Sequence, residues 1–206
     1  MFLIDTLLPV ALAFFIVTVS PGPANLAVAS VAMRQGRSAG HIFGLGLSMG
    51  LAFWGIVAAT GMGAVLQASA DALFILKVLG GLYLLWLAFQ STRSAIQPKA
   101  TDTTAFKRGH WFWQGLLLNL SNPKAVVAWM AALSVGLNAD GAATEIAILT
   151  GICIAIGFAN YAGYAAAFSL SGVMSGYRRI ARWVEGTVAV LFAAAGLGLL
   201  RSAFAR

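Results

Sequence analysis

The chain has 206 residues, of which 60% are hydrophobic and only 9% are charged, and its mean hydropathy is +0.87. Soluble domains average roughly 45–50% apolar and about 25% charged residues. The 13 Lys or Arg and 6 Asp or Glu side chains therefore cannot cover a water-exposed surface. This excludes a soluble enzyme, a nucleic-acid-binding module and a disordered tail, and indicates an all-α integral membrane protein. The net charge of +7 is then better explained by basic loops on the cytoplasmic side of a bilayer than by nucleic-acid binding.

Six stretches are long and apolar enough to cross a bilayer, which takes about 20 residues of helix. They cover residues 6–33, 42–67, 72–92, 111–137, 146–170 and 184–201. The first stretch is not a signal peptide, because Asp5 is the only charge before Arg34 and the uncharged run is too long. The short connections leave no room for a soluble domain, so residues 1–206 are predicted to form a single transmembrane domain.

The basic residues alternate between the connections. Along the five loops the Lys and Arg counts are 2, 0, 4, 0 and 3. The residues concerned are Arg34, Arg37, Arg93, Lys99, Lys107, Arg108, Arg178, Arg179 and Arg182. The positive-inside rule then places both termini outside the cytoplasm, although Arg201 and Arg206 follow the last span. The segment of about 93–110 is the predicted cytoplasmic linker.

The two halves of the chain share a register. Pro21 and Pro123 are 102 residues apart, and Gly81 and Gly186 are 105 apart, each close to half the chain. Because each half holds three predicted spans, the second half must enter the membrane from the opposite side. This predicts two inverted three-helix repeats, at about 1–92 and 111–206, a plan common in secondary transporters. Chance matching among 23 glycines is the alternative.

Two of the predicted spans carry sequences that cannot continue a regular helix. They are Ser20–Asn25, with Pro21 and Pro23 around a glycine, and Asn119–Lys124. A proline inside a helix removes a hydrogen-bond donor and clashes with the carbonyl four residues back. Helices 1 and 4 are therefore predicted to be broken, with the breaks facing protein or a wet cavity rather than lipid. A kink that only shapes packing is the alternative.

Such breaks suit a zwitterionic solute. The N-terminus of a half-helix attracts a carboxylate, and unwound carbonyls with Asn side chains can hold an ammonium group. Lys124 lies about 13 residues, or roughly 20 Å, from the end of its span, too far to reach the interface, so we expect it to face a cavity. The predicted substrate-binding residues are Ser20, Pro21, Gly22, Pro23, Asn25, Asn119, Asn122, Pro123, Lys124 and Asn160.

Three further ionisable residues are weaker candidates. Glu145, Glu185 and His41 lie near the ends of predicted spans, where they either carry protons or sit at the membrane interface. No hydrolase, zinc-protease or ATP-binding motif is present, and the single cysteine, Cys153, excludes a CxxC pair. The sequence therefore predicts no catalytic site, no metal site, no cofactor and no direct use of ATP.

The two proline motifs together resemble those of the LysE/RhtB family of bacterial amino-acid exporters. The motifs are Ser20–Pro23 and Asn122–Ala125, and Arg34–Gly40 and Gly80–Leu87 add support. The resemblance covers nearly the whole chain. It implies a six-helix protein of the inner membrane that exports amino acids or close derivatives, driven by the proton-motive force.

The sequence is therefore interpreted as a secondary exporter that works by alternating access and proton antiport, with an amino acid and protons as its ligands. Where some family members are acidic, after a glycine near the start of the second helix, this chain has Leu51 after Gly50, which argues against a cationic substrate. A membrane enzyme or redox subunit, and a non-transporting assembly protein, are the alternatives. Whether the protein forms a homodimer is left open.

Overall fold

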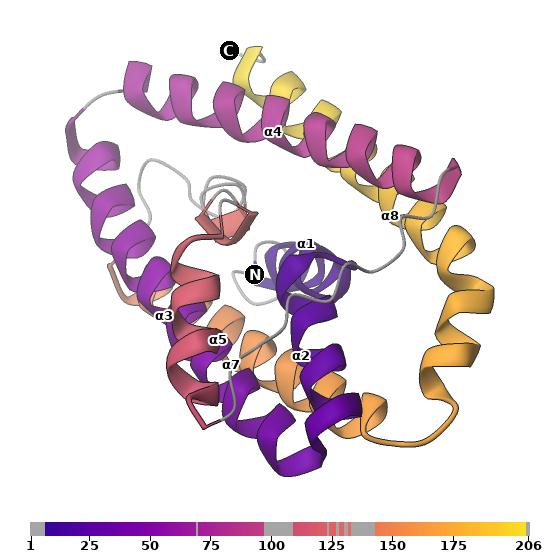
Figure 1. The fold of residues 1–206 in the computed structure, drawn as a ribbon. Coiled ribbons are helices and arrows are strands. Elements are labelled where there is room, and N and C mark those ends of the chain that lie inside the picture. The colour runs from indigo at the N-terminus through magenta and orange to yellow at the C-terminus, as the bar shows by residue number, and fades with distance from the viewer. Residues whose placement is uncertain are drawn as a thin grey trace.

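The structure, a computed structural model, describes residues 7–68, 70–96, 109–122, 124–126, 128–129, 132 and 143–204. Apart from short connections, these ranges are helical, and they contain no strand (Figure 1). The helices are α1 (Leu8–Val19), α2 (Pro23–Gln35), α3 (Arg37–Ala68), α4 (Ala70–Ile96), α5 (Trp111–Leu120), α7 (Ala143–Phe168) and α8 (Val173–Phe204). The prediction of an all-helical protein is confirmed for the described residues.

The first predicted span is two helices joined at a sharp break. The axes of α1 and α2 differ by 55° across the short segment that separates them. The α1 helix ends before Pro21, and Gly22 is fully extended, with φ −162° and ψ 173°. Pro23 then takes the first position of α2, where its missing N–H costs no hydrogen bond. The prolines thus end one helix and begin the next.

The predicted fourth span is also interrupted at its motif. The α5 helix ends at Leu120, and Ser121 and Asn122 are not helical. Among the residues described after them, 124–126, 128–129 and 132 are helical again. Pro123 and residues 133–137 of the predicted span lie outside the described residues.

Several basic residues assigned to loops belong to helices. Arg93 lies in the last turn of α4, and Arg178, Arg179 and Arg182 lie in the first turns of α8. The connection before α8 is only residues 169–172, so α8 begins about three turns before the predicted start of the sixth span at 184. Arg is a good helix former, so helices continue beyond the hydrocarbon into the polar interface. Of the predicted linker 93–110, residues 97–108 lie outside the described part of the chain.

Glycines allow the helices to cross at backbone contact. A Cβ built on Gly46 of α3 would lie 2.0 Å from the Phe112 carbonyl oxygen, and one on Gly115 of α5 would lie 2.2 Å from the Phe43 oxygen. No side chain fits in either place, so α3 and α5 touch through their main chains, as small residues allow in membrane proteins.

The helices form two groups. One group contains α2, α3, α5 and α7, with α1 packed against α7, and α4 lies lengthwise along α8 in the other (Figure 1). The α4–α8 pair is close-packed at Gly81, where an added Cβ would lie 2.7 Å from the Leu200 side chain. Contacts between the α4–α8 pair and the rest of the described chain are few. The α4–α8 pair is therefore a nearly separate unit beside the main bundle.

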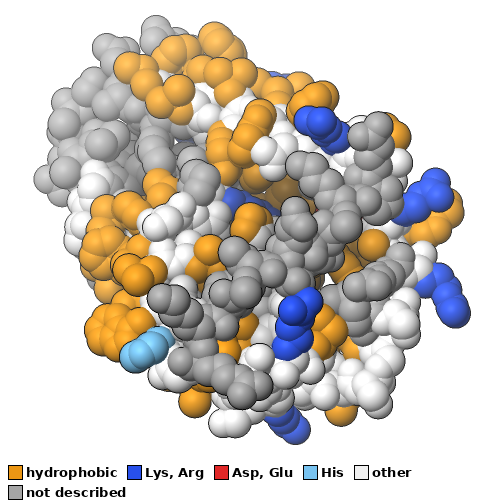
Figure 2. All heavy atoms as spheres, viewed as in Figure 1, with side chains coloured by type: hydrophobic (Ala, Val, Ile, Leu, Met, Phe, Trp, Pro, Cys, Tyr) orange, Lys and Arg blue, Asp and Glu red, His pale blue; other side chains and the backbone are white. Residues whose placement is uncertain are grey.

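The described helices include candidate membrane spans. Three are long and apolar enough, at Arg37–Gly61, Thr144–Phe168 and Arg179–Phe204, and the bent α1–α2 pair makes a fourth if it counts as one span. Large apolar side chains lie on the surface, among them Trp183 at 81% exposure. Figure 2 shows hydrophobic side chains exposed on one face of the molecule. A lipid environment explains such exposure. The six-span arrangement with two inverted repeats stays a prediction.

Candidate functional site

The two helix breaks meet through one side chain. The Lys124 Nζ donates a hydrogen bond to the Ser20 carbonyl oxygen at 3.2 Å and a second, short one to Ser20 Oγ. Ser20 is 1% exposed. The residues are 104 positions apart, one in each motif. The expected charge inside a span is thus partnered by the main chain of the other break, as a buried ammonium group requires.

The carbonyl groups freed at the first break have side-chain partners. The Asn25 amide nitrogen donates to the Thr18 oxygen at 2.7 Å and to the Ser20 oxygen at 2.9 Å. The Tyr164 hydroxyl on α7 donates to the Val19 oxygen at 2.8 Å. Three consecutive carbonyls that a continuous helix would satisfy are therefore satisfied by other groups, and the break can exist in a low-dielectric environment.

Asn160 on α7 is joined to the same network. Its amide nitrogen donates to Asn25 Oδ1 at 3.0 Å. Its own Oδ1 is buried and accepts no hydrogen bond from the described residues. A buried acceptor without a donor costs free energy, so this oxygen is suited to receive a donor from a bound solute.

The second break is held by two asparagines. Asn122 Oδ1 accepts a hydrogen bond from the Lys124 backbone N–H at 3.1 Å, the contact of a residue that caps a helix N-terminus. Asn119 is fully buried and donates to the Leu47 oxygen and to the Tyr161 hydroxyl, the latter at 3.3 Å. The Trp54 indole donates to the Leu120 oxygen at 3.2 Å. The resumed helix therefore begins at the point where Lys124 reaches across to the first break.

A small cavity lies between the breaks. Its volume is about 30 Å³. It is lined by Val17, Thr18, Ser20, Gly22, Ala24, Asn25, Leu51, Asn122, Lys124, Ala125, Ala128 and Tyr161. This is space for about one water molecule. In this structure the two breaks are therefore in contact, and the cavity between them is too small for an amino acid.

The surroundings of Lys124 are tight and partly charged. A Cβ on Gly22 would lie 3.1 Å from the Lys124 Nζ, so the glycine leaves room for the ammonium group. On the other side the Nζ lies 5.8 Å from the centre of the Phe192 ring of α8. Glu185, two turns earlier on α8, interacts electrostatically with Lys124. The cation is thus surrounded by a main-chain oxygen, an aromatic face and a more distant carboxylate.

The structure separates the predicted site residues into groups. Ser20, Gly22, Asn25, Asn122 and Lys124 line the cavity, and Asn119 and Asn160 bond to its walls. Pro21 and Pro23 form the break without lining the cavity, and Pro123 lies outside the described residues.

Two of the three proton-coupling candidates lie away from the cavity. His41 accepts a hydrogen bond from Arg37 Nε at 3.3 Å at an exposed position of α3. Glu145 lies in the first turn of α7. Glu185 alone is near Lys124.

Several cavity residues are not among the predicted site residues. Val17, Thr18 and Ala24 lie within one turn of the first break, and Ala125 and Ala128 follow Lys124 at one and four positions. Helical spacing from the motifs would have found these five residues. Leu51 reaches the cavity from α3, a placement that only the tertiary packing determines.

The chain matches the family model described as LysE type translocator over residues 15–203. The chain belongs to this family. The threonine efflux protein of Escherichia coli K12 is 30% identical over 200 residues, covering 95% of this chain and 97% of that protein. The threonine efflux protein of Salmonella typhi is 32% identical over 200 residues, covering 94% and 96%.

A more distant relative has a different named substrate. The leucine efflux protein of Enterobacter sp. (strain 638) is 28% identical over 192 residues, covering 87% of each chain. No solved structure matches the chain. The resemblance read from the two proline motifs is confirmed, and the protein is a membrane transport protein of the LysE type translocator family.

Proposed function

We propose that this protein is a secondary exporter of amino acids or close derivatives in the bacterial inner membrane. It crosses the membrane six times as two inverted three-helix repeats, joined by a cytoplasmic linker, with both termini outside. It works by alternating access and proton antiport. Family membership over residues 15–203 and relatives named for threonine and leucine efflux support the transport of amino acids.

The observation that carries the proposal is the bridge between the breaks. Lys124 is a cation held by Ser20, a neutral partner, inside a cavity that both motifs line. A substrate carboxylate is a stronger acceptor for an ammonium group than a serine, because charge-assisted pairs are about twice as strong as neutral ones. A substrate that displaces Ser20 from Lys124 therefore opens the cavity as it binds.

The other end of an amino acid finds acceptors nearby. Asn160 Oδ1 lacks a donor among the described residues, and it lies one hydrogen bond from Asn25 in the cavity wall. An α-ammonium group supplies three donors. In the proposed complex Lys124, beside the second break, holds the carboxylate, and Asn160 of α7 holds the ammonium group.

The packing of α4 with α8 is in keeping with the two repeats. These helices are the third element of each proposed repeat, and they lie lengthwise along each other with Gly81 and Gly196 at their contact. Third helices that pair across the two halves are expected when an axis in the membrane plane relates the repeats.

Export by the protein in inside-out membrane vesicles tests the proposal. In these vesicles export from the cytoplasm becomes uptake, which we expect for a radiolabelled neutral amino acid such as leucine or threonine. Uptake should require an acidic vesicle interior and should stop when a protonophore collapses the gradient. Overexpressing cells should also tolerate toxic amino-acid analogues. Uptake of no amino acid at normal protein levels would contradict the proposed function, and uptake that ignores the protonophore would contradict proton antiport alone.

A further inference from the structure

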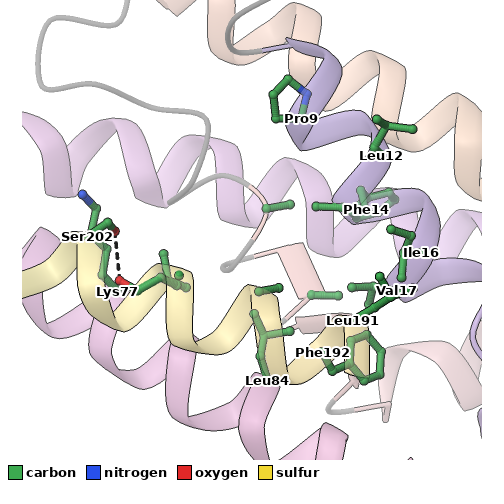
Figure 3. Close-up of a pocket in the computed structure, with 16 residues that line it drawn as sticks. Pro9, Leu12, Phe14, Ile16, Val17, Lys77, Leu84, Leu191, Phe192 and Ser202 are labelled. Carbon is green, nitrogen blue, oxygen red and sulfur yellow. Dashed lines mark hydrogen bonds between the residues drawn. The ribbon is translucent and has the colours of Figure 1, made fainter. Parts of the chain in front are cut away.

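A second and much larger space lies beside the polar cavity. It is a crevice of about 590 Å³ between α1 and the α4–α8 pair, within the range of small-molecule sites (Figure 3). Its walls are almost entirely apolar: Leu12, Ile16, Leu84, Leu191 and Leu199 are among them. None of the residues whose hydrogen bonds hold the two breaks together lines the crevice.

The inner end of the crevice adjoins the polar cavity. Val17 and Ala128 line both spaces. Phe192 is 2% exposed and forms part of the crevice wall, and its ring lies 5.8 Å from the Lys124 Nζ on the cavity side. Figure 3 shows Phe192 beside Val17 at this end. The Phe192 ring therefore lies between the crevice and the cation of the site, beside the two residues that line both spaces.

The opposite end of the crevice carries its polar groups. Lys77, near the start of α4, and Ser202, near the end of α8, lie together there (Figure 3). In the proposed orientation this end faces away from the cytoplasm. A lysine at the end of an otherwise apolar crevice needs hydration, so water rather than lipid is expected to enter.

We propose that the crevice is the outward vestibule of the substrate site, with Phe192 as the gate at its inner end, and that its apolar walls favour amino acids with aliphatic side chains. The inference rests on the proposed export function. Each methylene group that the walls bury is worth about fourfold in affinity. The walls offer no acceptors for a charged side chain, and Leu51 in the cavity adds another apolar surface.

Cysteine labelling distinguishes a wet vestibule from a lipid-filled groove. The background variant is Cys153→Ala, which removes the single native cysteine. That cysteine is 0% exposed. Ala195 lines the crevice and is exposed. Its neighbour Ala194 is exposed as well, and it lies between Val190 and Leu197 on the outer face of α8. A membrane-impermeant, charged maleimide added from outside should modify Ala195→Cys at least tenfold faster than Ala194→Cys. Excess leucine should change the rate for Ala195→Cys alone.

The labelling rate of Ala13→Cys, in the crevice wall on α1, is a second measurement of access to the crevice. We expect it to react like Ala195→Cys. Equal rates at 195 and 194, or reaction at 195 and 13 only with a lipid-soluble maleimide, would overturn the vestibule and indicate a groove filled by acyl chains. This readout does not depend on transport, so it stands whether or not the wild type exports an amino acid.

Narrowing the crevice tests the side-chain preference. In Ala195→Phe the export of leucine should fall at least tenfold and that of alanine less than threefold, because only the longer side chain needs the space. Phe192→Ala should allow labelling of Ala125→Cys, deep in the cavity, without substrate. An equal loss for leucine and alanine would overturn the preference. If the wild type exports no amino acid, the proposed function fails instead.

Discussion

Lys124 is the one cation that the described structure places between the two breaks, and its contacts set what the site can bind. Its ammonium group touches Ser20 from the first break and faces Phe192 from α8. Both of these contacts are neutral, and the Glu185 carboxylate acts on the ammonium group only from a distance. A bound carboxylate would supply a negative charge in direct contact with Lys124.

The variant Lys124→Met tests this role. Methionine keeps the length of the side chain and removes the charge, and substrate affinity should weaken roughly 10- to 150-fold, the equivalent of about 1.5–3 kcal/mol for a hydrogen bond to a charged group. Stability should change by less than about 1 kcal/mol, because the lost bonds to Ser20 are offset by removal of a buried charge. The measurements are vesicle transport kinetics and unfolding in detergent.

Thr187→Met is the matched control for that change. Thr187 is exposed on α8 and donates to the Trp183 carbonyl, away from the cavity. Its kinetics should equal those of the wild type. An unchanged apparent affinity in Lys124→Met, with normal protein levels, would show that the lysine does not bind the substrate.

At the scale of elements, the first break is held by more than its prolines. Asn25 and Tyr164 satisfy the carbonyls of Thr18, Val19 and Ser20. Pro23 would still lack a donor if Pro21 alone were replaced. The bend therefore depends on side chains that the proline motif does not contain, and Asn25 contributes the largest share of these contacts.

We expect Asn25→Leu to lose both stability and export. Leucine has a similar size but leaves the Thr18 carbonyl and the Asn160 amide without their partner, a cost of about 2–6 kcal/mol at roughly 1–3 for each unsatisfied group, whereas the Ser20 carbonyl keeps its bond from Lys124. Ser30→Ala, at a buried position on the same helix, should cost less than about 1 kcal/mol. Thermal unfolding in detergent measures both. Similar losses in the two variants would mean that Asn25 has no special role at the break.

The close crossing of α3 and α5 leads to a second prediction, which concerns the stability of glycine variants. Gly46→Ala places a methyl group 2.0 Å from the Phe112 oxygen, so the helices must separate, and we expect destabilisation of about 3 kcal/mol or more. Gly61→Ala lies on the same helix in open space and should stabilise by roughly 0.5–1 kcal/mol through helix propensity. Unfolding midpoints in detergent would show the opposite signs, and a neutral Gly46→Ala would contradict backbone contact.

Sequence reasoning located the breaks but not their partners. Proline stereochemistry is local, so Ser20–Asn25 and Asn119–Lys124 could be recognised as breaks from their residues alone. That Lys124 would meet Ser20, or Asn160 would meet Asn25, depends on how helices pack over more than a hundred residues of separation. The sequence predicts a loop at the arginines of α8, because an apolar stretch marks only the part of a helix that lies in the membrane and not its charged extension.

At the scale of the whole molecule, the nearly separate α4–α8 pair was not predicted. Both helices were recognised as apolar stretches, but apolarity does not say which neighbour a membrane helix prefers. Gly81 and Gly196 decide it by allowing close approach. The crevice beside α1 follows from the few contacts between this pair and the bundle, and no sequence motif marks it.

Orientation is the prediction that belongs to the whole chain. Loop charges of 2, 0, 4, 0 and 3 place the C-terminus outside the cytoplasm, even though the three arginines counted for the last loop belong to α8. A C-terminal reporter that works only outside the cytoplasm should therefore be active. The same reporter inserted at residue 103 should be silent. The reverse pattern would place both termini inside.

The pairing of α4 with α8 also bears on how the chain is made. The principal partner of α4 is α8, which leaves the ribosome roughly 100 residues later, or about 5–20 s at ordinary rates of synthesis. During that interval the glycine face of α4 meets lipid or an insertion chaperone instead of Leu200. A chain cut short before α8 would keep every residue that lines the polar cavity and still leave α4 unpaired. Premature termination should therefore yield a protein that membrane proteases recognise through its fourth helix.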